Sequence, residues 1–175
     1  TELVERVNRL VPVVVIGDRN TSLNVDTVEM NNYSAGAIIA HYMIGLGHKH
    51  IAYISTTLNE ANSARVRRLE GVRDTYRDEC PEGSVIVRSR EVTHGVLDAI
   101  RAEGSRVPED YSVCGFDNIF PSQFLPVGLT TVEHYIADKG RNAFEILHSK
   151  MSGESSDRNI TRVEFKHHSV SYTHL

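Results

Sequence analysis

Charged side chains stand at the ends of two predicted strands, where they are placed to bind a small molecule. Asp18 and Arg19 follow an apolar, β-branched run, and Asp117 follows the run that begins at Tyr111. A carboxylate can accept two hydrogen bonds from neighbouring hydroxyls, and a guanidinium group donates in a planar fork. The same residues also suit simpler roles, since Asp18 and Arg19 fit an ordinary turn and Asp117 fits the cap of a helical turn at 119–124.

The sequence lacks the spacings that metal binding or catalysis requires. No two of its nine histidines are four residues apart, the spacing at which a helix presents two imidazoles to one zinc ion. The Gly-x-Ser-x-Gly, Walker and Gly-x-Gly-x-x-Gly motifs are absent, and Gly45-Leu-Gly47 ends a predicted helix instead of opening one. We therefore predict that the chain is not an enzyme and that it holds neither a metal ion nor a cofactor.

The composition is that of a folded globular protein. The 175 residues are 40% hydrophobic and 24% charged, and no stretch approaches the roughly twenty apolar residues of a membrane span. The net charge of −4 argues against direct contact with DNA by these residues. No secretory signal opens the chain, and Cys80 and Cys114 form no Cys-x-x-Cys pair. These features favour a cytoplasmic location without a membrane partner.

Buried-strand patterns alternate with helical periodicity along most of the chain. Such alternation predicts βαβ crossovers and a doubly wound α/β fold with parallel sheets, in which ligands bind beyond the carboxyl ends of strands. A polar connection through Asn20, Asn24 and Asp26 is expected between the first strand and the next helix. The pattern predicts helices at 3–10, 32–47, 62–79, 92–102 and 136–151, strands at 11–18, 51–55, 85–87 and 111–116, and late edge strands at 163–165 and 170–172.

Several segments carry a resemblance to a known family. In chain order they are Asn32-Tyr-Ser-Ala-Gly36, Gly45-Leu-Gly-His-Lys-His-Ile-Ala-Tyr-Ile54, Arg68-Leu-Glu-Gly71, the run from Gly104 through Val107-Pro-Glu-Asp110 to Gly115-Phe-Asp-Asn118, and Leu129-Thr-Thr-Val132. Together they resemble the LacI/GalR family of bacterial regulators, whose sensor half shares the fold of periplasmic sugar-binding proteins. The resemblance covers most of the chain from Asn31 to Gly153.

The resemblance implies a two-lobed, periplasmic-binding-protein-like (type I) domain. Residues 1–30 would be a remnant of the first lobe, 31–118 the second lobe, and 119–175 the crossover back to the first lobe, with a helix and terminal strands. Much of the first lobe and the upstream DNA-binding headpiece are then absent from these residues. Near 80–95 the family has a further helix and strand, whereas Ser89-Arg-Glu-Val-Thr-His94 stands here. Either residues are missing from the sequence or the second lobe has a true deletion that removes part of its pocket.

The same resemblance assigns roles to residues of the second lobe. Arg68 is implied to contact the ligand, although helical periodicity alone favours a solvated charge. Asp117 matches the family's hydroxyl-binding aspartate, and Phe116 would stack on a sugar face or pack in the core. Ser63 opens the helix of Arg68, where with Asn62 it would line the cleft or cap the helix. The predicted ligand-binding residues are Asp117, Arg68, Asp18, Arg19, Ser63 and Phe116.

The function implied by the resemblance is ligand sensing and dimerisation in a transcriptional regulator. A sugar or similar polar effector would bind between the two lobes of a homodimer and control operator DNA binding by the headpiece. The apolar faces of the first helix and of residues 136–147 are candidates for the dimer surface, with burial inside the lobe as the alternative. A second interpretation is a periplasmic sugar-binding protein of a transport system, because the fold would be the same.

Overall fold

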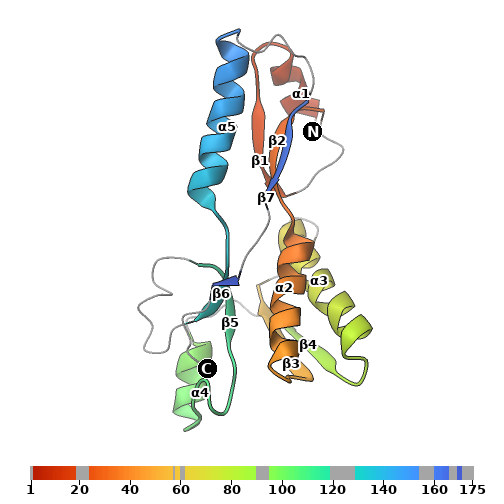
Figure 1. Ribbon diagram of the computed structural model, residues 1–175, viewed down its shortest axis with the longest axis vertical. Helices are drawn as coiled ribbons and strands as arrows, with labels where there is room; N and C mark the ends of the chain where they lie inside the picture. Colours follow the sequence, from red (N-terminus) through yellow and green to blue (C-terminus); the bar gives the residue numbers. More distant parts are fainter. Residues whose placement is uncertain are drawn as a thin grey trace. The chain divides into compact units, whose positions relative to one another are not determined.

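Two compact units make up the chain in the computed structural model. Unit 1 comprises Thr1–Asn31 and Tyr135–Lys166, and unit 2 comprises Asn32–His134 and His167–Leu175. The structure describes residues 2–18, 24–56, 58–59, 62–89, 95–118, 129–153, 160–165 and 169–170, with the backbone alone at 18, 89 and 170. Helices and parallel strands occur in both units (Figure 1), which confirms the predicted α/β class.

Unit 1 is a parallel sheet accompanied by one long helix. Its elements are α1 (Glu2–Asn8), β1 (Val14–Asp18), β2 (Asp26–Met30), α5 (Ile136–Met151) and β7 (Arg162–Phe165). The described strands run in the order β1-β2-β7, with Val14 opposite Asp26 and Thr27 opposite Arg162. In this order β2 is the central strand. The helix α5 contacts both β1 and β2.

The strand β2 corrects the prediction of a polar connection through Asp26. Three of its five residues are polar or charged, yet Asp26, Val28 and Glu29 are all buried. Lys150 donates to the Asp26 carboxylate across 2.7 Å, and the backbone N–H of Thr161 donates to it across 2.8 Å. Because the buried carboxylate is paired and hydrogen-bonded, a strand with a polar sequence occupies the middle of a sheet.

Unit 2 contains two separate sheets among its described residues. The first joins β3 (His50–Ser55) to β4 (Ser84–Ser89) in parallel, and the second has the order β5-β6-β8. The strands β5 (Cys114–Asp117) and β6 (Thr130–Glu133) are parallel, and β8 (Ser169–Val170) is antiparallel to β6. The helices are α2 (Asn32–Gly45), α3 (Ser63–Glu79) and α4 (Val96–Ala102). The strand β6 was not predicted, although its residues Thr130, Thr131 and Val132 are β-branched and buried.

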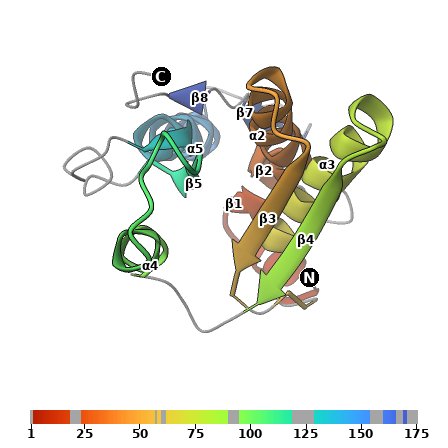
Figure 2. The ribbon, with the colours of Figure 1, turned by 90° about the horizontal axis from the view of Figure 1, so that it is seen from below.

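The helices α2 and α3 form the core of unit 2 with one face of the β3–β4 sheet (Figure 2). The buried residues Ala40, Val72, Tyr76 and Cys80 pack with partly buried side chains from both strands. Burial raises the pKa of Tyr76 to about 12, and its hydroxyl donates to the carbonyl of His48 across 2.8 Å. This core supports the helix that carries Arg68.

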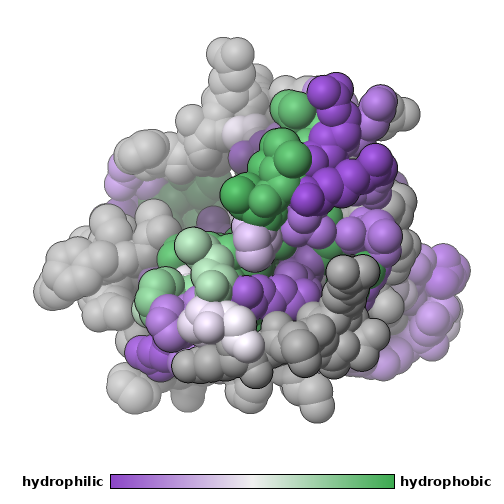
Figure 3. All heavy atoms as spheres, turned by 90° about the horizontal axis from the view of Figure 1, so that it is seen from above, coloured by the Kyte–Doolittle hydropathy of each residue, from purple (hydrophilic) through white to green (hydrophobic). Residues whose placement is uncertain are grey.

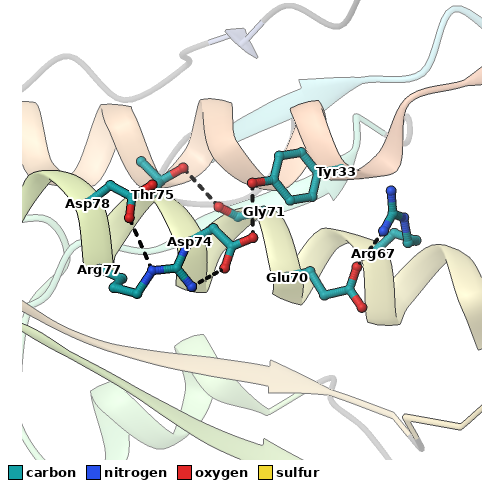
Figure 4. A network of polar contacts seen from close by, with 8 residues as sticks. All are labelled: Tyr33, Arg67, Glu70, Gly71, Asp74, Thr75, Arg77 and Asp78. Carbon is teal, nitrogen blue, oxygen red and sulfur yellow. Dashed lines mark hydrogen bonds and ion pairs between the residues drawn. The ribbon is translucent and has the colours of Figure 1, made fainter.

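Two glycines bring α2 and α3 into backbone contact. A Cβ atom at Gly36 would collide with the carbonyl oxygen of Arg68, and one at Gly71 would collide with that of Tyr33. Further along the same pair, the hydroxyl of Tyr33 donates to Asp74 across 3.0 Å (Figure 4). The Asn32–Gly36 and Arg68–Gly71 motifs therefore specify one close helix crossing, which sets Arg68 beside the start of α2.

Large hydrophobic side chains remain exposed on α5, on α1 and in the turn that follows α1. The exposed fractions are 70% for Leu3, 85% for Leu10, 65% for Phe144 and 70% for Met151. Figure 3 shows hydrophobic residues gathered on part of the surface seen from above, beside hydrophilic ones. None of the described helices is both long and apolar enough to cross a membrane.

Candidate functional site

Three polar side chains from distant parts of the sequence meet in unit 2. Arg68 comes from α3, Asp117 ends β5, and His134 follows β6. The Nε2 atom of His134 lies 3.0 Å from Oδ1 of Asp117, and Nη2 of Arg68 lies 3.8 Å from the same oxygen. The Arg68 and His134 side chains are 16% and 10% exposed, whereas that of Asp117 is 46% exposed. The carboxylate is thus the accessible member of the cluster.

The guanidinium group of Arg68 is fixed from several sides. Its Nε donates to Oδ1 of Asn32 across 2.7 Å, and Asn32 is buried at the start of α2. Its Cζ atom lies 3.6 Å from the centre of the Phe116 ring, in a cation–π contact. The rings of Phe116 and His134 form a T-shaped pair, with centroids 4.8 Å apart and planes at 86°. The Arg68 side chain is therefore largely buried and fixed by its neighbours. It is not the solvated helix charge of the alternative interpretation.

The turn after β5 presents Asp117 in an uncommon backbone conformation. The φ angles are 81° at Asp117 and 44° at Asn118, both in the left-handed region that costs most residues about 1–3 kcal/mol. The Asn118 amide donates to Glu133 across 2.9 Å, and its backbone N–H donates to the Thr131 hydroxyl across 3.2 Å. Bonds to β6 thus hold a strained turn, and strain of this kind is typical of ligand sites.

The structure brings together three of the predicted ligand-binding residues: Arg68, Asp117 and Phe116. Ser63 is the exposed first residue of α3, and Asn62 before it makes no side-chain capping bond, because its Oδ1 accepts from Arg65 across 2.7 Å. A ligand contact at Ser63 stays a prediction.

Two predicted residues belong to unit 1. The backbone of Asp18 ends β1, while the Asp18 side chain and Arg19 lie outside the described residues. The helical turn at 119–124 that Asp117 would cap also lies outside them. The roles of Asp18 and Arg19 stay predictions.

Two residues of the site were not among the predicted ligand-binding residues. Asn32 was predicted only as the first residue of a helix, and its side chain accepts from Arg68. His134 was counted among nine histidines without a partner at metal-binding spacing. Its position two residues after the Leu129–Val132 motif was the usable signal, because the strand of that motif pairs with the strand of Asp117.

Within the described residues, no group of three His, Cys, Asp or Glu side chains is arranged to hold a metal ion.

The cluster can bind a polar molecule through complementary groups. Arg68 is a cationic donor with fixed geometry, and Asp117 is an anionic acceptor. Among the described residues, the contacts of His134 and Arg68 with the Asp117 carboxylate are both to Oδ1, and the Asp117 side chain is 46% exposed. A donor and an acceptor beside an aromatic ring suit hydroxyl groups on a carbon skeleton.

Known proteins resemble the chain over most of its length. A sequence model of the periplasmic binding protein-like domain matches residues 41–166. The HTH-type transcriptional repressor PurR of Histophilus somni is 27% identical over 87% of this chain and 54% of its own length. The chain thus spans about half the length of this relative.

Solved structures share the fold. A LacI-family transcriptional regulator from Enterococcus faecium, with bound ribose, has a TM-score of 0.75 at 19% identity over 99% of this chain and 74% of its own. A periplasmic binding protein/LacI transcriptional regulator from Alkaliphilus metalliredigens, complexed with D-xylulofuranose, has a TM-score of 0.72 at 20% identity over 93% of this chain and 70% of its own.

Parallel α/β sheets with polar side chains at the carboxyl ends of strands are typical of ligand-binding domains. By the family match, the chain belongs to the periplasmic binding protein-like domain family. Within it, the chain is an effector-binding domain of the LacI/GalR type, which confirms the resemblance predicted from its motifs.

Proposed function

We propose that the chain senses a sugar or a similar neutral, hydroxyl-rich effector through Arg68, Asp117 and Phe116. The observation that carries the proposal is the pairing of a fixed guanidinium group with an accessible carboxylate at the carboxyl end of β5. Adjacent hydroxyls both donate and accept, so one sugar edge can satisfy the two groups together. The structural neighbours with ribose and D-xylulofuranose support a sugar. A further contact of the effector with Asp18, Arg19 or Ser63 is part of the proposal.

The effector would regulate transcription. The relative named as an HTH-type transcriptional repressor supports a regulator over the transport-protein alternative and over an enzyme. Binding to operator DNA would belong to a part of the protein outside these 175 residues, in keeping with the net charge of −4. A regulator of this kind acts in the cytoplasm, where the DNA is. Effector binding would change the population of DNA-binding arrangements.

A homodimer is the assembly that we propose for the regulator. The exposed side chains of Leu3 on α1, Leu10 just after it, and Phe144 and Met151 on α5 supply apolar surface on unit 1. Burial of this apolar surface against a second copy of the chain would favour dimerisation.

A thermal-shift screen of the 175-residue chain with sugars, sugar phosphates and purines tests the proposed site. A ligand at one hundred times its Kd stabilises the folded state by about 2.7 kcal/mol, which raises the melting temperature measurably. We expect a sugar to do so for the wild type and not for Asp117→Ala. The matched control is Asp98→Ala, an exposed carboxylate on α4, which should leave the shift unchanged. An equal shift in Asp117→Ala would contradict the proposed site.

A further inference from the structure

The imidazole of His134 lies between a hydrogen-bond acceptor and a hydrogen-bond donor. Its Nε2 atom is 3.0 Å from Oδ1 of Asp117 and 3.3 Å from Nη2 of Arg68. The His134 side chain is 10% exposed, whereas that of Asp117 is 46% exposed. Phe116 meets the ring edge to face, which restricts its rotation.

One nitrogen cannot satisfy both neighbours. A guanidinium group only donates hydrogen bonds, and a carboxylate only accepts them. If Nε2 carries a proton, His134 donates to Asp117 and turns an N–H toward Arg68. If Nε2 carries a lone pair, His134 accepts from Arg68 and turns that lone pair toward Asp117. The shorter contact is the one to the carboxylate, and a hydrogen bond to a charged acceptor is the stronger kind, so the first arrangement is favoured.

We propose that His134 is a positioning residue of the effector site, where its Nε2–H holds Oδ1 of Asp117 and leaves Oδ2 to accept from an effector hydroxyl. The inference rests on the proposed function. The observation behind it is that His134 and Arg68, the two described partners in the ion pairs of Asp117, both approach its Oδ1 atom. An effector hydroxyl that donates to Oδ2 would also accept from Arg68, whose Nη2 faces an N–H of the ring.

The proton on His134 can be located without any effector. In long-range ¹H–¹⁵N spectra of the ligand-free chain at pH 8, where most imidazoles are neutral, we expect His134 to carry its proton on Nε2. The His134→Gln variant assigns the signal by removing it, and Asp117→Ala should shift it. A lone pair on Nε2 would overturn the proposal, because His134 would then accept from Arg68 and could not hold Asp117.

Binding of D-ribose, measured by calorimetry, separates the positioning role from packing. Gln keeps an N–H donor, whereas Leu fills similar space without one. We expect His134→Gln to bind within about threefold of the wild type and His134→Leu to bind about tenfold or more weakly, the range for a hydrogen bond to a charged group. His50→Leu, at an exposed histidine bonded to Ser84, is the control for loss of an imidazole.

The two experiments distinguish the inference from the proposed function. Equal binding by His134→Leu and wild type, or equal weakening in the Gln and Leu variants, would overturn the positioning role. If the wild type binds neither ribose nor any compound of the thermal-shift screen, the proposed function fails. The NMR result then still decides whether Nε2–H holds Asp117. Urea unfolding of each variant identifies any loss of affinity that follows from loss of folding.

Discussion

Gly71 of α3 lies against the backbone carbonyl of Tyr33 in α2, so closely that no side chain fits between the two helices. Gly36 of α2 makes the reciprocal contact with Arg68. Because of this crossing, the Nε of Arg68 reaches the Asn32 side chain at the start of α2. The two glycines therefore determine the position of the Arg68 guanidinium group.

Substitution of Gly71 by alanine should destabilise the chain by about 3 kcal/mol, because the added methyl must push one helix backbone away from the other. Urea unfolding measures the loss. The control is Gly45→Ala at the end of α2, where a Cβ would meet nothing within 4 Å. Alanine there should be neutral or stabilising by up to about 1 kcal/mol. An equal response at the two positions would contradict the close crossing.

Replacing Arg68 by lysine should weaken sugar binding about tenfold or more, although the charge is kept. An ammonium group lacks the planar fork that contacts Asn32 while lying over the Phe116 ring. Calorimetry with the sugar found in the screen measures the affinity. Arg67→Lys is the matched control. The Arg67 side chain, next to Arg68 in the sequence, is 55% exposed and pairs with Glu70 on the surface. Wild-type affinity in Arg68→Lys would remove Arg68 from the site.

The buried pair of Asp26 and Lys150 should stabilise unit 1 strongly. The side chains are 3% and 18% exposed, and loss of the carboxylate leaves the ammonium group and the Thr161 N–H without their acceptor. We expect Asp26→Ala to lower the free energy of unfolding by about 3–5 kcal/mol. The surface pair of Arg67 and Glu70 provides the comparison, since Glu70→Ala should cost under about 1 kcal/mol. A small loss in Asp26→Ala would contradict a strong contribution of the Asp26–Lys150 pair to the stability of unit 1.

Cys114 should react slowly with alkylating reagents. Burial raises the pKa of its thiol from 9.0 to about 11, so the reactive thiolate is about 100-fold scarcer at pH 8 than in the unfolded chain. Iodoacetamide labelling of the Cys80→Ser variant, with and without urea, measures the ratio. Because the folded-state pKa is the higher one, the stabilising contribution is complete below pH 9 and is lost as the pH rises toward 11. Equal labelling rates in the two conditions would contradict the burial of this thiol.

Introducing a charge at Phe144 should weaken self-association of the chain. Its ring is 65% exposed on α5, and a glutamate would place a carboxylate in the proposed apolar interface. Sedimentation velocity of Phe144→Glu should show a shift toward monomer relative to the wild type. Leu46→Glu, at a side chain 41% exposed at the end of α2, is the control in unit 2. Association of Phe144→Glu at the wild-type level would place the dimer surface elsewhere.

The elements that the sequence reveals are those whose burial shows in residue type. The run Val14–Asp18 is mostly apolar and was predicted as a strand. Asp26–Met30 is a strand of the same length, but its burial could not be predicted because two of its buried residues carry charges. The charges are paired with residues more than a hundred positions away, as Asp26 is with Lys150. A local sequence pattern therefore cannot predict these pairs.

The site divides in the same way. Arg68, Asp117 and Phe116 stand in motifs that can be read along the chain. His134 becomes a partner of Asp117 only because β6 pairs beside β5. Asn32 becomes a partner of Arg68 only because two glycines let α2 and α3 touch. Contacts that depend on a strand pairing or a helix crossing need the three-dimensional structure.

The division of unit 2 into two sheets gives the cluster a second property. Arg68 and Asn32 belong to the half built on β3 and β4, while Phe116, Asp117 and His134 belong to the half built on β5 and β6. An effector that contacts both Arg68 and Asp117 would therefore link the two halves and stabilise them against separation. Its occupancy should be detectable as slowed amide hydrogen exchange in β6, and chemical denaturation should abolish binding before α2 and α3 lose their helical signal.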